Sequence, residues 1–200
     1  MMLLIGVTGQ SGGGKTEVCA YFKSKGYFII DGDEIAHLVT NTNTDLLAEL
    51  KENFGASIFN EDGSLNRKIL GSLVFSDPDK LKMLNKITHK YILAEFDVLV
   101  SKAISNGERA VFIDAAALIE SGYHKKCDYM IYVKAPLEKR IERVLKRDGI
   151  TLKEARMRLT SQKKDEFYES NCDFVVINDD DKNRLKIQLD KILEKIIGDK

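Results

Sequence analysis

The 200-residue sequence has few of the residues that mark whole classes of protein. It contains no Trp and only two Pro, and its three cysteines, Cys19, Cys127 and Cys172, are isolated. An odd number of scattered cysteines excludes a disulfide framework and the C-x-x-C pattern of many zinc and redox sites. We expect these residues to act as small, buried apolar side chains in a reducing compartment.

Net charge and long apolar runs are also lacking. Lys plus Arg and Asp plus Glu both number 31, so no overall charge attracts nucleic acid or an anionic membrane. No apolar run approaches the roughly 18 residues of a membrane span, and the N-terminal run is too short for a signal peptide. We therefore expect one soluble, cytoplasmic core with insertions and with no nucleic-acid or membrane partner.

The clearest feature that the chain does have is a glycine-rich turn between an apolar run and a helical segment. Residues 3–7 have the length of a buried strand, and residues 9–16 read GQSGGGKT, which fits G-x-x-x-x-G-K-[ST]. Such a backbone can point successive N–H groups at phosphate oxygens, and the following helix adds its positive dipole end. Lys15 would meet the β- and γ-phosphates, and the Thr16 hydroxyl would meet Mg²⁺. The candidate ATP-binding residues here are Gly9, Ser11, Gly12, Gly13, Gly14, Lys15, Thr16 and Glu17.

Two carboxylates, Asp31 and Asp33, follow a second predicted strand at residues 27–30. Ligand sites in open α/β sheets lie beyond the carboxyl ends of the strands. A carboxylate there can bind Mg²⁺ through water or accept a proton from a hydroxyl group. The alternative is an Asp that caps the helix predicted over residues 34–39. Since one Asp can cap while the other reacts, we favour the catalytic role for Asp33.

The remaining strands are predicted at residues 110–114, 129–133 and 174–177. Asp114 ends the first of them, as a Walker-B-type carboxylate would. No strand pattern occurs between residues 35 and 106, where amphipathic helical segments include a long one from Pro78 to about Ser105 with a candidate break near His89. By fold-level analogy this insertion carries the acceptor site; the alternative is a purely structural cap.

Positive charge is concentrated in residues 134–164, which hold eleven Lys or Arg and four Asp or Glu. In a kinase with this kind of loop, such a stretch is where a lid would close over the transferring phosphates. The alternative, a solvated face with i,i+4 ion pairs, fits most of these residues. For Arg140 we favour phosphate contact.

Taken in order, these features resemble dephospho-CoA kinases over essentially the whole chain. The resemblance rests on the loop, on Asp31-Gly32-Asp33 followed by Glu34-Ile35-Ala36, and on later pieces in the same order. These are Phe54-Gly55, residues 62–67, His89, Asp114, residues 118–122, Arg140, residues 147–151, Gln162 and residues 173–178. Three segments depart from the family's usual pattern: Lys90 replaces a Pro, residues 115–120 replace I-P-L-L-F-E, and Gly9-Gln10 replaces Gly-Gly.

The resemblance implies an α/β fold of the P-loop type, with a five-stranded parallel sheet of order 2-3-1-4-5 flanked by helices. It implies a nucleotide-binding core over residues 1–36, 107–137 and 165–200, a helical acceptor domain over 37–106 and a lid over 138–164. It further implies an enzyme that transfers the ATP γ-phosphoryl group to the ribose 3′-hydroxyl of dephospho-CoA, the last step of coenzyme A biosynthesis. ATP and dephospho-CoA are the implied partners, and we expect a monomer or a weak homo-oligomer.

The resemblance also implies site residues. Asp33, Lys15 and Arg140 are expected to be catalytic, with Asp33 as the proton acceptor. Arg147 and Asn178 join the loop residues as ATP contacts. The expected substrate-binding residues are Asp33, His89, Asp114 and Leu118. Mg²⁺ is expected on Thr16, with Asp33 or Asp114 as further ligands through water.

Three other functions compete with this interpretation. A different small-molecule or nucleotide kinase would share every argument about the loop and differ only in its acceptor. A GTP-dependent switch needs a base-reading N-K-x-D, and residues 85–88, NKIT, lack its carboxylate. An RNA-binding module using residues 134–164 lacks interleaved aromatic residues for base stacking.

Overall fold

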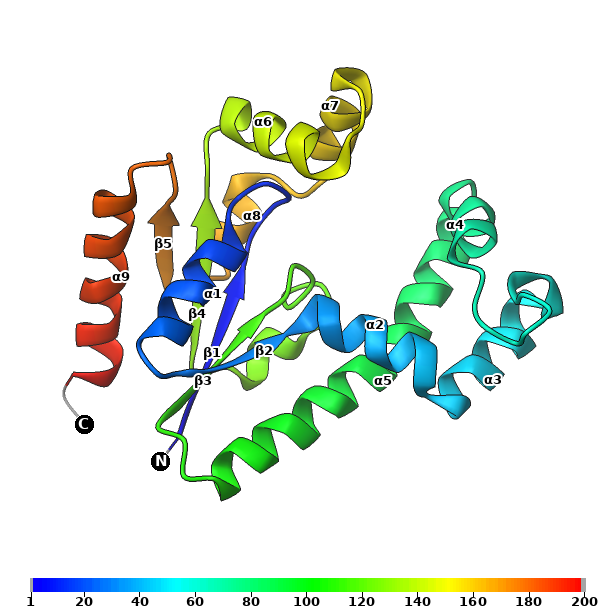
Figure 1. Cartoon of the computed structure of the whole chain (residues 1–200), viewed down its shortest axis with the longest axis horizontal. Coiled ribbons are helices and arrows are strands. Elements are labelled where there is room, and N and C mark those ends of the chain that lie inside the picture. The colour runs from blue at the N-terminus through cyan, green and yellow to red at the C-terminus, as the bar shows by residue number, and fades with distance from the viewer. Residues whose placement is uncertain (1, 199–200) are drawn as a thin grey trace. The chain divides into compact units, whose positions relative to one another are not determined.

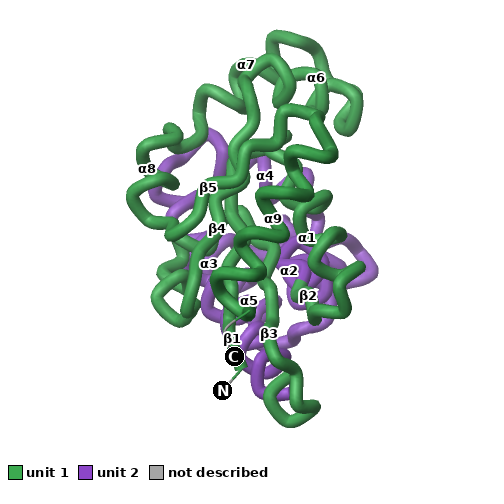
Figure 2. The backbone as a smooth tube through the Cα atoms, turned by 90° about the vertical axis from the view of Figure 1, so that its left-hand side faces the viewer, with its two compact units in different colours: residues 1–30, 103–200 green, residues 31–102 purple. Residues whose placement is uncertain are grey.

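The computed structural model describes residues 2–198, and the chain divides into two compact units. One unit comprises residues 1–30 and 103–200, and the other comprises residues 31–102 (Figure 2). The first contains the sheet and the glycine-rich loop. The second is helical. The predicted acceptor domain at 37–106 overlaps this helical unit, and its function stays a prediction.

A five-stranded parallel sheet forms the centre of the first unit. Its strands are β1 (Leu3–Thr8), β2 (Phe28–Asp31), β3 (Ala110–Asp114), β4 (Tyr129–Lys134) and β5 (Phe174–Ile177). Their order, β2-β3-β1-β4-β5, confirms the predicted topology. Every residue of β1 is buried because β1 lies at the centre, paired with β3 on one side and β4 on the other. A central parallel strand therefore reads as a continuous apolar run, as residues 3–7 do.

One face of the sheet is covered by α1 (Lys15–Ser24) and α9 (Lys182–Ile197), and Figure 1 shows α9 beside β5. Alternate residues of β1 pack there against the apolar faces of the two helices. Phe22 of α1 stacks on Phe112 of β3, with ring centroids 4.1 Å apart. Gly26, at φ 90°, follows α1 in the left-handed conformation that ends helices. This packing fixes the direction of α1, and with it the position of the glycine-rich loop that precedes α1.

The other face of the sheet meets α8 (Asp165–Glu169), whose Tyr168 stacks on Tyr132 of β4 at 4.8 Å between centroids. A short 3-10 helix, η2 (Tyr123–Lys126), connects β3 to β4. Beyond the carboxyl end of β4 lie α6 (Leu137–Asp148) and α7 (Leu152–Thr160), which share a small apolar core of their own (Figure 1). Thr151 and Glu154 form a capping box at the start of α7.

The helical unit is built from α2 (Gly32–Thr42), α3 (Thr44–Phe54), η1 (Ala56–Ile58), α4 (Arg67–Phe75) and most of α5 (Pro78–Ser105). Its core includes Leu46, Leu50 and Ile58, each fully buried. The candidate break near His89 is wrong, since α5 runs through it without interruption. The segment has neither Gly nor Pro after Pro78, so nothing in it interrupts the hydrogen-bond ladder.

Candidate functional site

The glycine-rich loop joins β1 to α1 at the carboxyl edge of the sheet. Gly12 and Gly14 have φ values of 76° and 94°, a region that L side chains rarely adopt. A Cβ on Gly12 would lie 2.6 Å from the Arg140 carbonyl oxygen, so the loop passes too close to α6 for any larger residue. Gly12 is therefore required both by the turn and by the packing of α6 against it.

The end of the loop presents backbone N–H groups. Glu17 and Val18 donate to the Gly14 carbonyl at 3.1 and 3.2 Å, and these are the first bonds of α1. The N–H groups of Lys15 and Thr16 precede them and have no acceptor within the helix. Thr16 is exposed, and Lys15 Nζ lies back over the loop, 3.4 Å from the Gly9 carbonyl oxygen. An anion placed here would meet free donors, the helix dipole and an ammonium group together.

The outer side of the loop is held by two arginines of α6. Arg143 Nη1 donates to the carbonyls of Gly12 at 2.9 Å and Gly13 at 3.2 Å, and Arg140 Nε donates to that of Ser11 at 3.1 Å. A peptide unit whose C=O points outward directs its N–H the opposite way. These cations therefore direct the N–H groups of Gly12 and Gly14 away from the arginines, while the N–H of Gly13 donates to the Gln10 carbonyl at 3.0 Å.

Arg140 is a buried residue, with 6 % of its surface exposed. Burial lowers the pKa of its guanidinium, while Tyr132, Asp165 and Tyr168 act in the opposite direction. The ordinary pKa of an arginine is so high that its guanidinium stays charged at neutral pH. Its second bond, from Nη2 to Gln162 Oε1 at 3.2 Å, leaves three of its five N–H donors without a partner in the described chain.

Asn178 follows β5 and lies against the loop, with 1 % of its surface exposed. Its Oδ1 accepts from Arg143 Nη2 at 3.0 Å, and its Nδ2 donates to Glu17 Oε2 at 3.1 Å. Arg143 Nη2 also pairs with Asp180, which has a φ of 74°. Both ends of the Asn178 amide are thus engaged within the protein, and Arg143 connects the loop to the turn after β5.

Asp114 ends β3 directly beside the start of the loop. It is paired in register with Val7 of β1, and the next residue, Ala115, donates its N–H to the Val7 carbonyl at 3.2 Å. Asp114 is 9 % exposed. Leu118 is fully buried, and a Cβ on Gly6 would lie 3.1 Å from its Cδ1. Leu118 is therefore a core residue here, and its predicted contact with substrate would require it to be uncovered.

In the helical unit, Asp31 is the N-cap of α2, since its Oδ1 accepts from the N–H groups of Asp33 at 2.9 Å and Glu34 at 3.0 Å. Asp33 is exposed in the first turn of α2, and its carboxylate has no hydrogen bond or ion pair within residues 2–198. Asp31 thus takes the capping role, and the catalytic role of Asp33 stays a prediction. His89 is half-buried midway along α5.

Arg147 lies two helical turns beyond Arg140 in α6. Its guanidinium bonds to Asp148 in two places, at 2.6 and 3.0 Å, and Arg158 reaches the same carboxylate at 2.7 Å. The side chain of Arg147 is 56 % exposed. Its contact with ATP stays a prediction, since Asp148, with which it pairs, lies on α6 itself.

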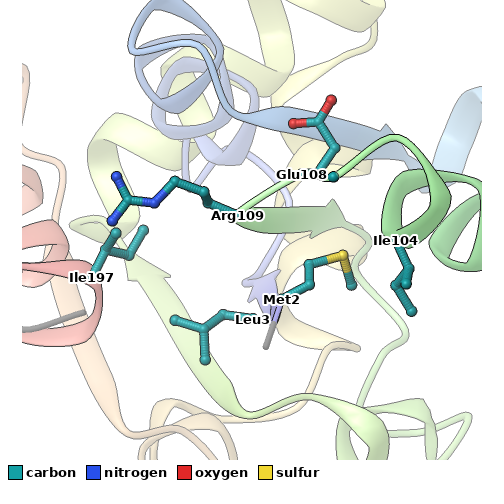
Figure 3. A pocket seen from close by; sticks show the side chains of 7 residues that line it. Met2, Leu3, Ile104, Glu108, Arg109 and Ile197 are labelled. Carbon is teal, nitrogen blue, oxygen red and sulfur yellow. The ribbon is translucent and has the colours of Figure 1, made fainter.

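A cavity of about 520 Å³ lies at the opposite end of β1 from the loop (Figure 3). Met2, Leu3, Arg109 and Ile197 are among its lining residues. None of the predicted site residues is among its lining residues. Within residues 2–198 no group of three or more His, Cys, Asp or Glu is placed to hold a metal, and no helix is long and apolar enough to cross a membrane.

Comparison with known proteins decides the family. A family model described as dephospho-CoA kinase matches residues 3–183. The chain belongs to that family. A dephospho-CoA kinase from Dehalococcoides mccartyi is 40% identical over 82% of this chain and 82% of its own length. A structure of dephospho-CoA kinase from Campylobacter jejuni superposes with a TM-score of 0.72 at 25% identity, covering 100% of this chain and 99% of that one.

The dephospho-CoA kinase family is defined by ATP-dependent phosphorylation of dephospho-CoA, the final step of coenzyme A biosynthesis, so the chain is a kinase with that activity. The predicted family, fold and enzyme class are confirmed. Shikimate kinase from Acinetobacter baumannii has a TM-score of 0.58 at 16% identity, covering 100% of this chain and 96% of its own. At this identity the likeness shows a shared fold alone. Because a shikimate kinase has this fold too, the fold by itself does not identify the acceptor.

Sequence reasoning on this kinase missed the role of Arg143, which was grouped with a solvated basic face. The signal was its spacing of three residues from Arg140, which places the two side chains on one face of α6. It also missed the side chain of Gln10, which is 6 % exposed and bonded at both ends. Gln10 was noted only as a departure from the family's usual Gly-Gly, and because the loop motif leaves that position open, no role could be predicted for its side chain.

Proposed function

We propose that this kinase binds ATP on residues 9–16 and transfers the γ-phosphoryl group to the ribose 3′-hydroxyl of dephospho-CoA. The observation that carries the proposal is the loop itself. Its carbonyls are held outward by Arg140 and Arg143, while the N–H groups of Lys15 and Thr16 remain without helical acceptors. Such donors are oriented before the nucleotide binds and cost little reorganisation during the reaction.

Lys15 and Arg140 would stabilise the transferring phosphoryl group. Lys15 Nζ has one long bond, 3.4 Å to Gly9, that a phosphate oxygen can easily replace. Arg140 retains unpartnered donors on a guanidinium already fixed by Ser11 and Gln162. An anchored planar donor reaching equatorial oxygens is a recurrent feature of phosphoryl transfer. Glu17, Arg147 and Asn178 complete the proposed ATP-binding set.

We propose Asp33 as the residue that orients the acceptor hydroxyl and accepts its proton. It lies two residues beyond the carboxyl end of β2, in a sheet whose ligand edge is the carboxyl edge. Asp31 already caps α2, so the Asp33 carboxylate is left available. His89, Asp114 and Leu118 are the further proposed substrate contacts, on an acceptor domain of residues 37–106 and on the core. Residues 138–164 form the proposed lid.

Mg²⁺ is the proposed metal, and the residues present fit it. The described residues offer no all-protein cage, and Mg²⁺ usually keeps several waters and binds through few side chains plus substrate phosphates. Thr16, exposed at the start of α1, offers the hydroxyl, and Asp33 or Asp114 could hold metal-bound water. When bound with ATP, the ion would neutralise charge that develops on the phosphates. A cytoplasmic location and a monomeric or weakly associated state remain our predictions.

An acceptor panel tests the proposal. Purified protein with ATP and Mg²⁺ is offered dephospho-CoA beside AMP, adenosine, pantothenate, shikimate and gluconate. We expect ADP release to be fastest with dephospho-CoA and the product to be phosphorylated at the ribose 3′ position. Preference for another acceptor, or phosphorylation at another position, would refute the specific claim while leaving the kinase fold unaffected.

A further inference from the structure

Gln10 stands in the first turn of the loop, at a position that the loop motif leaves open. Its Nε2 donates to the Lys163 carbonyl at 2.7 Å, and its Oε1 lies 3.2 Å from the Tyr132 hydroxyl. The residue is 6 % exposed, so both ends of the amide are bonded where water has little access. Buried amides whose bonds are complete fix the segments that they join.

The neighbouring loop residue, Ser11, makes a second link to the same place. Its N–H donates to Gln162 Oε1 at 3.1 Å, and Gln162 Nε2 donates to its Oγ at 3.1 Å. Two consecutive loop residues, Gln10 and Ser11, are therefore bonded to two consecutive residues, Gln162 and Lys163, which follow the C-cap of α7. We call residues 162–165 the C-terminal root of the proposed lid.

The root is held from the other side by β4. The Tyr132 hydroxyl shares its hydrogen between Gln10 and Asp165, with Asp165 Oδ1 the nearer at 2.9 Å. Asp165 Oδ2 also pairs with Lys134 Nζ at 2.9 Å. Burial acts to raise the pKa of Asp165, but the bonds from Lys134 and Tyr132 outweigh it and hold the pKa below its usual range. The root is thus bonded to the sheet as well as to the loop.

We propose that Gln10 is a positioning residue that anchors the C-terminal root of the lid to the phosphate loop, so that the lid closes about a fixed point at residues 162–165. The inference rests on the proposed function, in which residues 138–164 form a lid. An anchored root would limit the ATP hydrolysis that occurs when water replaces the acceptor. Gln10 touches no reacting atom in this role and acts through the lid.

The test compares Gln10→Ala with a matched control, Gln188→Ala, in the full-length protein. Gln188 is also bonded at both ends, to the N–H and C=O of Ile177 at 2.9 Å each, but it joins α9 to β5. Hydrogen exchange is followed in residues 161–167, where the N–H groups of Ser161 and Phe167 are bonded within the backbone. Loss of one or two neutral hydrogen bonds should speed exchange there by about 3- to 10-fold in Gln10→Ala only.

A second readout is the rate of ADP formation without acceptor, divided by the rate with dephospho-CoA. It should rise in Gln10→Ala and stay at the wild-type value in Gln188→Ala. Gln10→Glu keeps the side-chain size but loses the donor to Lys163, so it should behave like Gln10→Ala and serves if the alanine variant does not fold. Equal exchange of residues 161–167 in both alanine variants would overturn the anchor. Exchange needs no turnover, so an inactive wild-type protein would refute the proposed function without deciding this inference.

Discussion

Replacing Arg143 with lysine should weaken nucleotide binding although the charge is kept. The guanidinium extends between two sets of acceptors: Nη1 reaches the carbonyls of Gly12 and Gly13, and Nη2 reaches Asn178 and Asp180. An ammonium group is a single point with three donors and cannot span both sets. Since Asp180 carries the opposing charge, lysine should stay with Asp180 and release the loop carbonyls.

The magnitude follows from the two bonds that are released. A hydrogen bond from a charged donor contributes about 1.5–3 kcal/mol, and partial exposure lets water replace some of it. The Arg143 side chain is 23% exposed, so we take about 1.5–2 kcal/mol as the loss to the ordered loop. If the binding-competent loop is destabilised by that amount, the apparent affinity for ADP should fall by up to roughly 10- to 30-fold.

The assay is titration calorimetry with ADP and Mg²⁺, beside a thermal unfolding scan. Arg184→Lys is the matched control, because the Arg184 side chain is 58% exposed and pairs with Asp179 at 2.7 Å on the surface. We expect the control to bind ADP as the wild type does. An Arg143→Lys variant with unchanged ADP affinity would refute the reasoning that fixing the carbonyls sets the loop.

Four further predictions address other parts of the chain. Lys15→Ala should lower kcat by more than about 100-fold while circular dichroism shows a folded protein, because it removes charge stabilisation of the transferring phosphoryl group; near-normal turnover would contradict this. Asp33→Asn should lose kcat with dephospho-CoA but keep ATP binding, since it removes the proton acceptor and keeps the shape. Bonds from Arg143 and Lys139 lower the pKa of Asp180 to about 2. The stability that the ionised Asp180 contributes should therefore be present above the pKa of the unfolded chain and lost as the pH falls through about 2. An acid titration of unfolding should lack this loss in Asp180→Asn. Burial raises the pKa of the Cys127 and Cys172 thiols to about 12, so iodoacetamide at pH 8 should modify both far more slowly in folded than in urea-unfolded protein.

The sequence was most informative where one physical requirement acts on neighbouring residues. The loop motif places its glycines, Lys15 and Thr16 within eight positions, and both the strand before it and the helix after it are found in the structure. The five strands could be predicted because each is a short apolar run bounded by turns, as is typical of parallel sheets. The order of the strands came from the resemblance, since pairing between distant segments leaves no mark on local periodicity.

Contacts between distant segments of the chain could not be predicted from the sequence. Arg143 and Gly12 are 131 residues apart, and Gln10 and Lys163 are 153 apart. Nothing in the composition of α6 separates Arg143, which binds loop carbonyls, from Arg147, which pairs with Asp148 in its own helix. Only the fold brings the loop beneath the first turns of α6. The sequence favoured Asp33 over Asp31 for the catalytic role but could not identify the residue that caps α2, because that depends on where the helix begins.

The basic stretch at residues 134–164 shows why local charge counts overstate what a nucleotide would encounter. Several of its cations are paired with acids that lie elsewhere in the chain. Lys134 pairs with Asp165 and Glu169, and Lys139 and Arg143 both pair with Asp180. At the distance of a Debye length, the opposite charges of such an exposed pair cancel one another. A donor held at hydrogen-bond distance from a phosphate still attracts it. Recognition of the phosphates should therefore depend on where Lys15, Arg140 and the loop N–H groups point, and little on the net charge of the lid.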